Sequence, residues 1–243
     1  MKALKLFCLI LLCIITHFNN LLSWDVPFII NLGTNNILDG GFKLQAPGFY
    51  WFQFERYYHA DQIMDYKGQV IQTTPIVRVN AVINETELVY KSEVNLFGGK
   101  LGASLQFPTL VFGDLSPNSL GLNIKTVGVT NPVLTAFIQY NTINYKDRPL
   151  FVHRLGTTVF LPLGTNGYPT YNINPAVIQW AIDSYWAATL FLTPKLAASW
   201  RLFYLWRAID QKTNVIPGAT FHMNYSAEYN VLPNFWSAIN IRK

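Results

Sequence analysis

Several segments of this chain alternate apolar and polar residues over about ten positions, the length of a membrane-crossing strand. Between residues 221 and 229 every odd-numbered residue is apolar or aromatic, and every even-numbered residue is polar. Segments 77–84, 100–107, 134–140 and 196–207 show the same pattern, with Val82, Phe203 and Leu205 among the apolar exceptions on the polar face. A period of two is typical of a β-strand whose faces meet different surroundings. The pattern therefore predicts strands with one apolar face and one wet face.

Composition indicates what the apolar faces meet. Hydrophobic residues make up 51% of the 243 residues and charged residues only 13%, about half of the roughly 25% usual for soluble domains. The most apolar later segment, residues 176–193, is interrupted by Gln179 and Asp183 and is too polar for a spanning helix. Lipid otherwise admits only closed barrels, because all backbone polar groups must be paired. We therefore predict an all-β fold, an antiparallel up-and-down transmembrane β-barrel of about 10–12 strands.

Other segments are less regular. Residues 49–58, 150–163 and 177–192 are expected to be strands with mixed faces. A helix from Pro175 to Leu190, with Asn174 as its N-cap, is the alternative for the last of them. Aromatic residues near strand ends, among them Trp180, Tyr185 and Trp206, suit the girdles that barrels place at the membrane surface.

The N-terminus resembles a secretory signal. Lys2 and Lys5 precede an apolar run of ten residues, Leu6 to Ile15, which is shorter than the roughly 20 needed to cross a bilayer. Cleavage after Ser23 would leave a single barrel domain, residues 24–243, and an uncleaved anchor helix is the alternative. Both cysteines, Cys8 and Cys13, lie in residues 1–23. The domain would then have no thiol for catalysis or metal binding.

Catalytic motifs are absent from the sequence. His59, His153 and His222 lack the helical spacing of a metal site, and neither a phosphate-binding glycine loop nor a Gly-x-Ser-x-Gly elbow occurs. We therefore expect no enzyme, no catalytic residues, no metal and no cofactor. The basic residues of 24–243 are too dispersed for a nucleic-acid surface.

Four segments resemble a known family. They are Ala46-Pro47-Gly48-Phe49-Tyr50 followed by residues 56–61, and then residues 184–189, 202–206 and 217–225. In order and spacing they are similar to the outer-membrane family named "putative MetA-pathway of phenol degradation". The resemblance implies an outer-membrane β-barrel that helps aromatic or other hydrophobic compounds across, and it brings no known binding residues. Family members usually continue for several strands beyond the equivalent of residues 235–241. We therefore expect either a C-terminally truncated, incomplete barrel or closure with fewer strands.

The polar faces should line the inside of such a barrel if the apolar faces meet lipid. Alternatively, these side chains only bond to one another and fill a small closed barrel. The candidate lumen-lining residues are Gln53, Arg78, Asn80, Gln106, Gln139, Arg201, His222 and Glu228.

The sequence therefore predicts an outer-membrane channel or transporter of a Gram-negative cell, taking up small hydrophobic or aromatic compounds. Its expected partners are outer-membrane lipid, these solutes and the barrel-assembly machinery. One alternative is a soluble periplasmic binding protein of lipocalin type, with its apolar faces inward. Another is a nonfunctional remnant of a longer barrel.

Overall fold

The computed structural model describes residues 38–41, 44, 46–61, 63–64, 69–71, 78–116, 128–129, 131–163, 180–209, 218–232 and 235–242. The predicted signal peptide, residues 1–23, lies outside these ranges. Throughout the described residues the regular structure is β, and it comprises thirteen strands. No helix in this part of the chain has the length and apolarity needed to cross a membrane.

The main sheet is an antiparallel meander whose neighbours in space are mostly neighbours in sequence. Its path is β1 (Gly48–Ala60), β4 (Arg78–Leu96), β5 (Gly99–Ser116), β7 (Val133–Tyr140), β9 (Arg148–Phe160), β10 (Ala181–Phe191), β11 (Leu196–Arg207), β12 (Thr220–Leu232) and β13 (Phe235–Arg242). The short strands β6 (Gly128–Val129) and β8 (Ile143–Tyr145) pair with β5 and β9 and bring the sheet to 11 strands. Strands β2 (Ile63–Met64) and β3 (Val70–Ile71) form a separate pair. The predicted all-β, antiparallel up-and-down fold is therefore confirmed.

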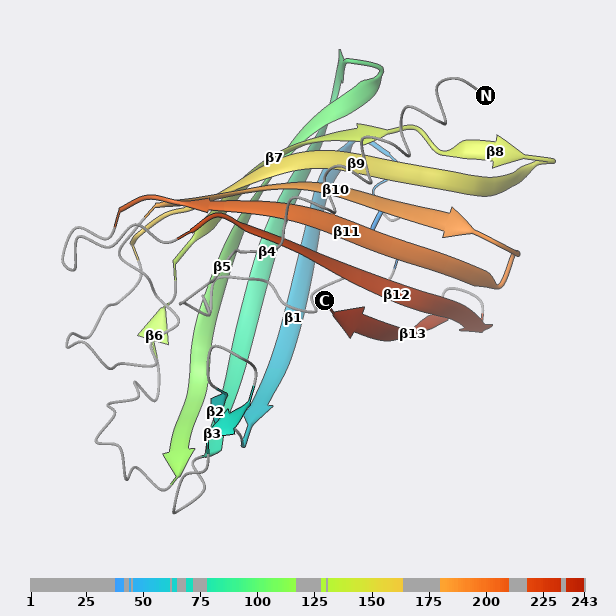
Figure 1. Ribbon diagram of the computed structural model, residues 1–243. Helices are drawn as coiled ribbons and strands as arrows, with labels where there is room; N and C mark the ends of the chain where they lie inside the picture. The colour runs from blue at the N-terminus through green and yellow to red at the C-terminus, as the bar shows by residue number, and fades with distance from the viewer. Residues whose placement is uncertain are drawn as a thin grey trace.

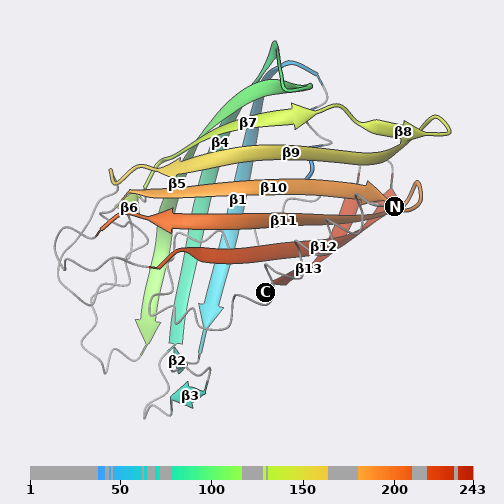
Figure 2. The same ribbon diagram turned by 45° about the horizontal axis from the view of Figure 1, so that its top comes forward.

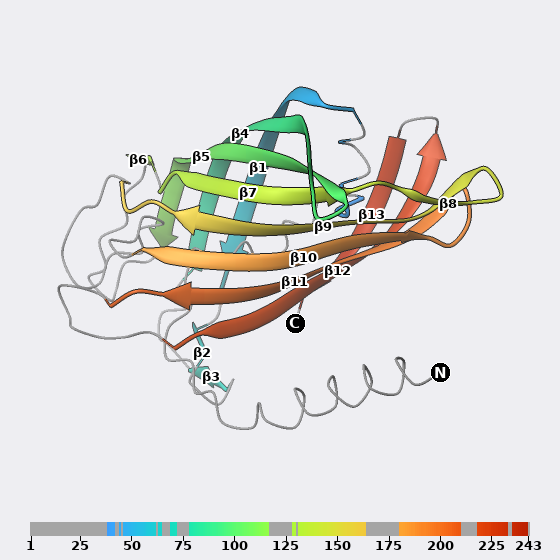
Figure 3. The same ribbon diagram turned by 90° about the horizontal axis from the view of Figure 1, so that it is seen from above.

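The sheet curls strongly, so that β1, β4 and β5 cross behind β9 to β12 (Figure 1). Figures 2 and 3 show the same crossing after rotation. Within the described residues the path ends at β1 and β13, each of which pairs on one side only. The result is an open half-barrel with one concave and one convex face.

The helical alternative for residues 175–190 is wrong over the described part of that segment. Residues 181–191 form β10, which pairs with β9 on one side and β11 on the other. Alternating exposure along β10 is set by these two neighbours: Ala181 and Asp183 are buried, whereas Ile182 is 38% exposed. Pairing with both neighbours thus overrides the helical pattern over residues 181–190.

The two faces of the sheet differ in chemistry on β7 to β12. Polar and charged side chains are buried on the concave face, including Asp183, Arg207 and Glu228. Large apolar side chains cover the convex face, where Leu134 is 46% exposed and Trp206 is 47% exposed. This orientation is the one predicted for a membrane barrel. It is the reverse of a lipocalin-like protein, whose apolar faces would point inward.

Strand β1 and the first part of β4 reverse the predicted orientation. On β1, Phe52 and Phe54 lie on the concave face, and Gln53 lies on the convex face with Trp51. On β4, Ile83 pairs with Arg56 of the concave face, whereas Asn80 pairs with His59 of the convex face. The pleat of the long strand fixes these directions from Glu85 and Leu88 onward, where the charge is buried and the leucine exposed.

Two glycines on the concave face make room for aromatic rings. The rings of Phe137 and Tyr185 lie against Gly102 and Gly156 of the neighbouring strands. A Cβ atom at Gly156 would lie 2.5 Å from the Tyr185 ring.

We expect Gly156→Ala to destabilise the fold by about 1–3 kcal/mol, because the Tyr185 ring must leave its place. Gly218→Ala is the matched control, since a Cβ there meets no atom within 4 Å. The denaturant midpoint of the detergent-folded chain, followed by tryptophan fluorescence, measures both variants. Equal midpoints would show that the ring does not need the glycine.

Candidate functional site

A short segment that precedes β1 crosses the concave face. We call residues 38–41 together with Leu44 the strap. Its backbone is held from β12 to β4: the Leu38 N–H donates to Glu228 Oε1 at 2.9 Å, and Lys91 Nζ donates to the Leu44 carbonyl at 2.6 Å. Between these ends the Gly40 N–H donates to Thr189 Oγ1, and Gln139 Nε2 donates to the Gly40 carbonyl, both at 2.9 Å. The strap therefore partly fills the interior.

Glu228 anchors the strap within a buried network. Its side chain is 0% exposed and accepts hydrogen bonds from the Leu38 N–H, from Ser226 Oγ at 2.8 Å and from Ser199 Oγ at 3.0 Å. Ser199 Oγ in turn shares a 2.7 Å hydrogen bond with Thr189 Oγ1. A buried carboxylate is stable where several donors surround it, as here.

Asp39 of the strap forms an ion pair with Arg201 of β11. The Asp39 side chain is 1% exposed, and that of Arg201 is 13% exposed. The contact uses Asp39 Oδ1 and Arg201 Nη2. The second carboxylate oxygen, Oδ2, and Arg201 Nε are buried and have no hydrogen-bond partner among the described residues. The pair is therefore only half satisfied.

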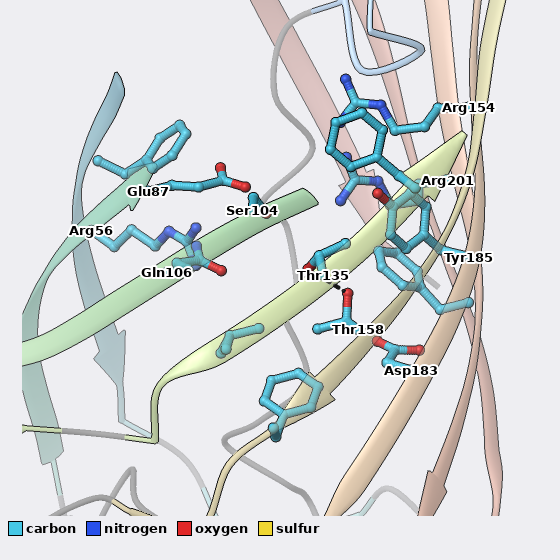
Figure 4. A pocket seen from close by; sticks show the side chains of 15 residues that line it. Arg56, Glu87, Ser104, Gln106, Thr135, Arg154, Thr158, Asp183, Tyr185 and Arg201 are labelled. Atoms are coloured by element: carbon cyan, nitrogen blue, oxygen red, sulfur yellow. Dashed lines mark hydrogen bonds between the residues drawn. The ribbon is translucent and has the colours of Figure 1, made fainter. Parts of the chain in front are cut away.

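A pocket opens beside the strap, between the two crossing groups of strands. In Figure 4, Arg154, Asp183, Tyr185 and Arg201 come from one wall, and Arg56, Glu87, Ser104 and Gln106 come from the other. Thr135 and Thr158 lie between them and share a 3.0 Å hydrogen bond.

Guanidinium groups lie over aromatic rings on one wall of this pocket. The Arg154 group is 4.7 Å from the centre of the Phe137 ring, and the Arg201 group is 4.7 Å from the Tyr185 ring and 5.6 Å from the Phe203 ring. Such contacts hold a cation over a ring face. The wall therefore offers positive charge and flat apolar surface side by side.

The opposite wall carries acidic as well as basic side chains. Arg56 pairs with Glu85 at 2.5 Å, and Glu85 is 3% exposed. Glu87 and, on the first wall, Asp183 also line the pocket. The pocket is therefore lined by both positively and negatively charged side chains.

Five of the predicted lumen-lining residues lie on the concave face. Gln106 lines the pocket, Gln139 contacts the strap, and Arg201 does both. Glu228 anchors the strap, and the His222 ring stacks on Phe203 with 4.4 Å between ring centres. That they line a solute path remains a prediction.

The other three are on the wrong face. Gln53 and Asn80 lie on the convex face, where Gln53 Nε2 donates to Asn84 Oδ1 and the Tyr57 hydroxyl donates to Asn80 Oδ1. Arg78 is exposed two residues before Asn80 on the same face of β4. The predicted contribution of Arg78 to interior charge is therefore wrong. Gln53 and Asn80 thus form hydrogen bonds with neighbouring side chains outside the concave interior.

Sequence reasoning missed several residues of the site. Tyr185 was expected in an aromatic girdle, yet it is buried in the pocket wall. Arg154 lies on a strand of mixed faces, and Asp39 lies in a segment without a repeat pattern. The sequence marks Arg154 and Asp39 only as polar residues close to predicted strands, and this does not indicate which side chains they contact.

A curled antiparallel meander with an apolar convex face and a buried polar concave face defines an outer-membrane type of β-barrel fold. The chain belongs to the family described as "Putative MetA-pathway of phenol degradation", whose sequence profile matches residues 60–241. The resemblance drawn from its motifs is thereby confirmed. The structure is similar to that of an outer membrane channel from Pseudomonas putida F1, with a TM-score of 0.65 and 16% identity over 80% of this chain and 69% of the other. Curated proteins give no match.

Proposed function

We propose that this chain is an outer-membrane channel, not an enzyme, and that it admits small hydrophobic or aromatic solutes. The observation that carries the proposal is the separation of chemistry between the faces: lipid-compatible side chains outside, hydrogen-bonded polar side chains inside. The solved relative is described as an outer membrane channel, and the family name refers to phenol degradation. Both support this assignment.

The interior favours aromatic solutes for a physical reason. Rings of Phe137, Tyr185 and Phe203 face the pocket, and offset or edge contacts between rings are favourable. Hydroxyl and amide groups such as Thr135 and Gln106 could bond a phenolic oxygen.

The location and partners follow from the same proposal. Residues 1–23 would direct export and be removed, leaving residues 24–243 as the barrel domain in the outer membrane. Its convex face would contact lipid, and the barrel-assembly machinery would insert it.

Membrane reconstitution tests the channel. We expect the chain to need detergent for extraction and to migrate differently on gels before and after boiling. Planar bilayers containing the folded chain should then conduct ions, whereas boiled protein should not. A folded, heat-modifiable chain that gives no conductance would contradict the proposal.

The strap should limit this conductance. Thr189→Val removes the acceptor of the Gly40 N–H, a loss of about 1 kcal/mol. A displaced strap should therefore be populated about fivefold more, and single-channel records should show the larger conductance level correspondingly more often. Thr157→Val is the matched control, because Thr157 lies on the convex face and is paired with Ser184. Identical records for the two variants would mean that the strap does not obstruct the path.

A further inference from the structure

We propose that the pocket binds aromatic monocarboxylates, and that the carboxylate of the solute replaces that of Asp39 at Arg201 and so releases the strap. This inference rests on the proposed function and specifies its solute class and its regulation. It is carried by the incomplete ion pair of Arg201, by a second guanidinium that forms no ion pair within the described residues, and by the aromatic rings beneath the two.

The Asp39 carboxylate marks where an anion binds. It reaches Arg201 from a segment 162 residues away in the sequence, through one oxygen and one nitrogen. Asp39 Oδ2 and Arg201 Nε stay without a partner among the described residues. A free carboxylate is not tethered to the strap, so it can engage Nε and Nη2 together in the bidentate geometry that guanidinium favours.

Arg154 supplies a second positive charge to the same pocket. Its Nε donates to Gln139 Oε1 at 2.9 Å. In the described part of the chain no carboxylate pairs with it, because the ion pairs there involve Arg56, Lys100 and Arg201. Arg154 and Arg201 both border the strap and the pocket. An anion arriving at Arg201 would therefore also be attracted by Arg154.

The surroundings of these guanidiniums select the rest of the solute. Phe137, Tyr185 and Phe203 lie beneath them, and Phe54 and Phe160 also line the pocket. A ring joined directly to a carboxylate could contact these faces while its charge meets Arg201. Glu87 and Asp183 line the same pocket and would repel a second carboxylate.

Charge balance explains why a neutral solute would not release the strap. If Asp39 leaves without replacement, the Arg201 charge remains nearly buried and unpaired, which is strongly unfavourable. A monocarboxylate restores the pair as Asp39 departs. A phenol or amide cannot do so, because it carries no negative charge.

Binding to the folded, full-length chain in detergent tests the site without relying on conduction. Calorimetric titration should give benzoate an affinity about tenfold above that of benzamide, equal to about 1.4 kcal/mol, and above those of cyclohexanecarboxylate and phthalate. Arg201→Gln and Arg154→Gln should each reduce the preference for benzoate over benzamide. Arg78→Gln, which removes an exposed charge from the convex face, should preserve it. If Arg201→Gln does not fold, the loss of the preference for benzoate over benzamide in Arg154→Gln is the test of the site.

Strap release has its own measurement. In a Cys8→Ser/Cys13→Ser background, the thiol introduced by Leu38→Cys should react slowly with a water-soluble maleimide, because Leu38 is 4% exposed. Benzoate should accelerate the reaction and benzamide should not, and Asp39→Asn should make labelling fast without any solute.

Equal affinity for benzoate and benzamide, or labelling unaffected by benzoate, would overturn the inference even if bilayers conduct. Absent conductance with benzoate-selective binding would instead refute the channel.

Discussion

Replacing Glu228 with alanine should destabilise the folded chain by about 3 kcal/mol or more. The carboxylate is fully buried and accepts from the Leu38 N–H, Ser199 Oγ and Ser226 Oγ. Its removal leaves these donors without their acceptor, and each buried unsatisfied group costs about 1–3 kcal/mol. Denaturant titration of the detergent-folded chain, followed by tryptophan fluorescence, measures the loss.

Two further variants interpret this result. Glu228→Gln keeps a carbonyl acceptor of the same shape, so it should cost less than Glu228→Ala. Asp61→Ala removes an exposed carboxylate just beyond the end of β1 and should change stability by no more than about 0.5 kcal/mol. If Glu228→Ala and Asp61→Ala had equal effects, the buried network around the strap would not stabilise the fold.

Placing an arginine at Leu155 should cost about 2–4 kcal/mol in a bilayer, as it does at the middle of lipid-facing barrel surfaces. Leu155 lies on the convex face, is 43% exposed, and pairs with Ile138 and Trp186. A charge at this position would contact acyl chains. Reversible unfolding of the chain in lipid vesicles, with the midpoint as readout, tests the prediction.

The same substitution distinguishes lipid from water. An exposed leucine of a soluble protein tolerates arginine within about 0.5 kcal/mol. Asn95→Arg, next to the exposed turn between β4 and β5, is the control and should be close to neutral. Equal tolerance at Leu155 and Asn95 would mean that the convex face meets water, and the membrane assignment would fail.

How well the sequence predicts which face of a strand points inward differs from strand to strand. On β12 the alternation is regular, and on β11 it holds despite the apolar Phe203 and Leu205 on the polar face; the faces it predicts agree with the burial of Ser199, Arg207 and Glu228. On β1 both faces carry aromatic residues, Trp51 on one and Phe52 on the other, so the pattern cannot tell which of them points inward. On β4 the local alternation before Glu85 gives the opposite direction to the rest of the strand.

The site was less accessible to sequence reasoning than the fold. Gln139, Arg201 and Glu228 could be identified because each lies on the polar face of a strand. Their partners could not: Asp39 and Leu38 belong to the strap, which is far from them in the chain and has no periodic pattern. Contacts of this kind depend on how the sheet curls.

The order of residues alone specifies the strands, the antiparallel meander and the existence of two chemically different faces, because period-two alternation and turn residues are local properties. Only the tertiary structure decides which face of β1 and β4 turns inward, and which carboxylate meets which guanidinium. The physical reason is that a strand's own pattern is symmetric between in and out. The direction is settled by pairing with neighbours and by charges such as Glu85, Asp39 and Glu228, which are buried where another segment can bond them.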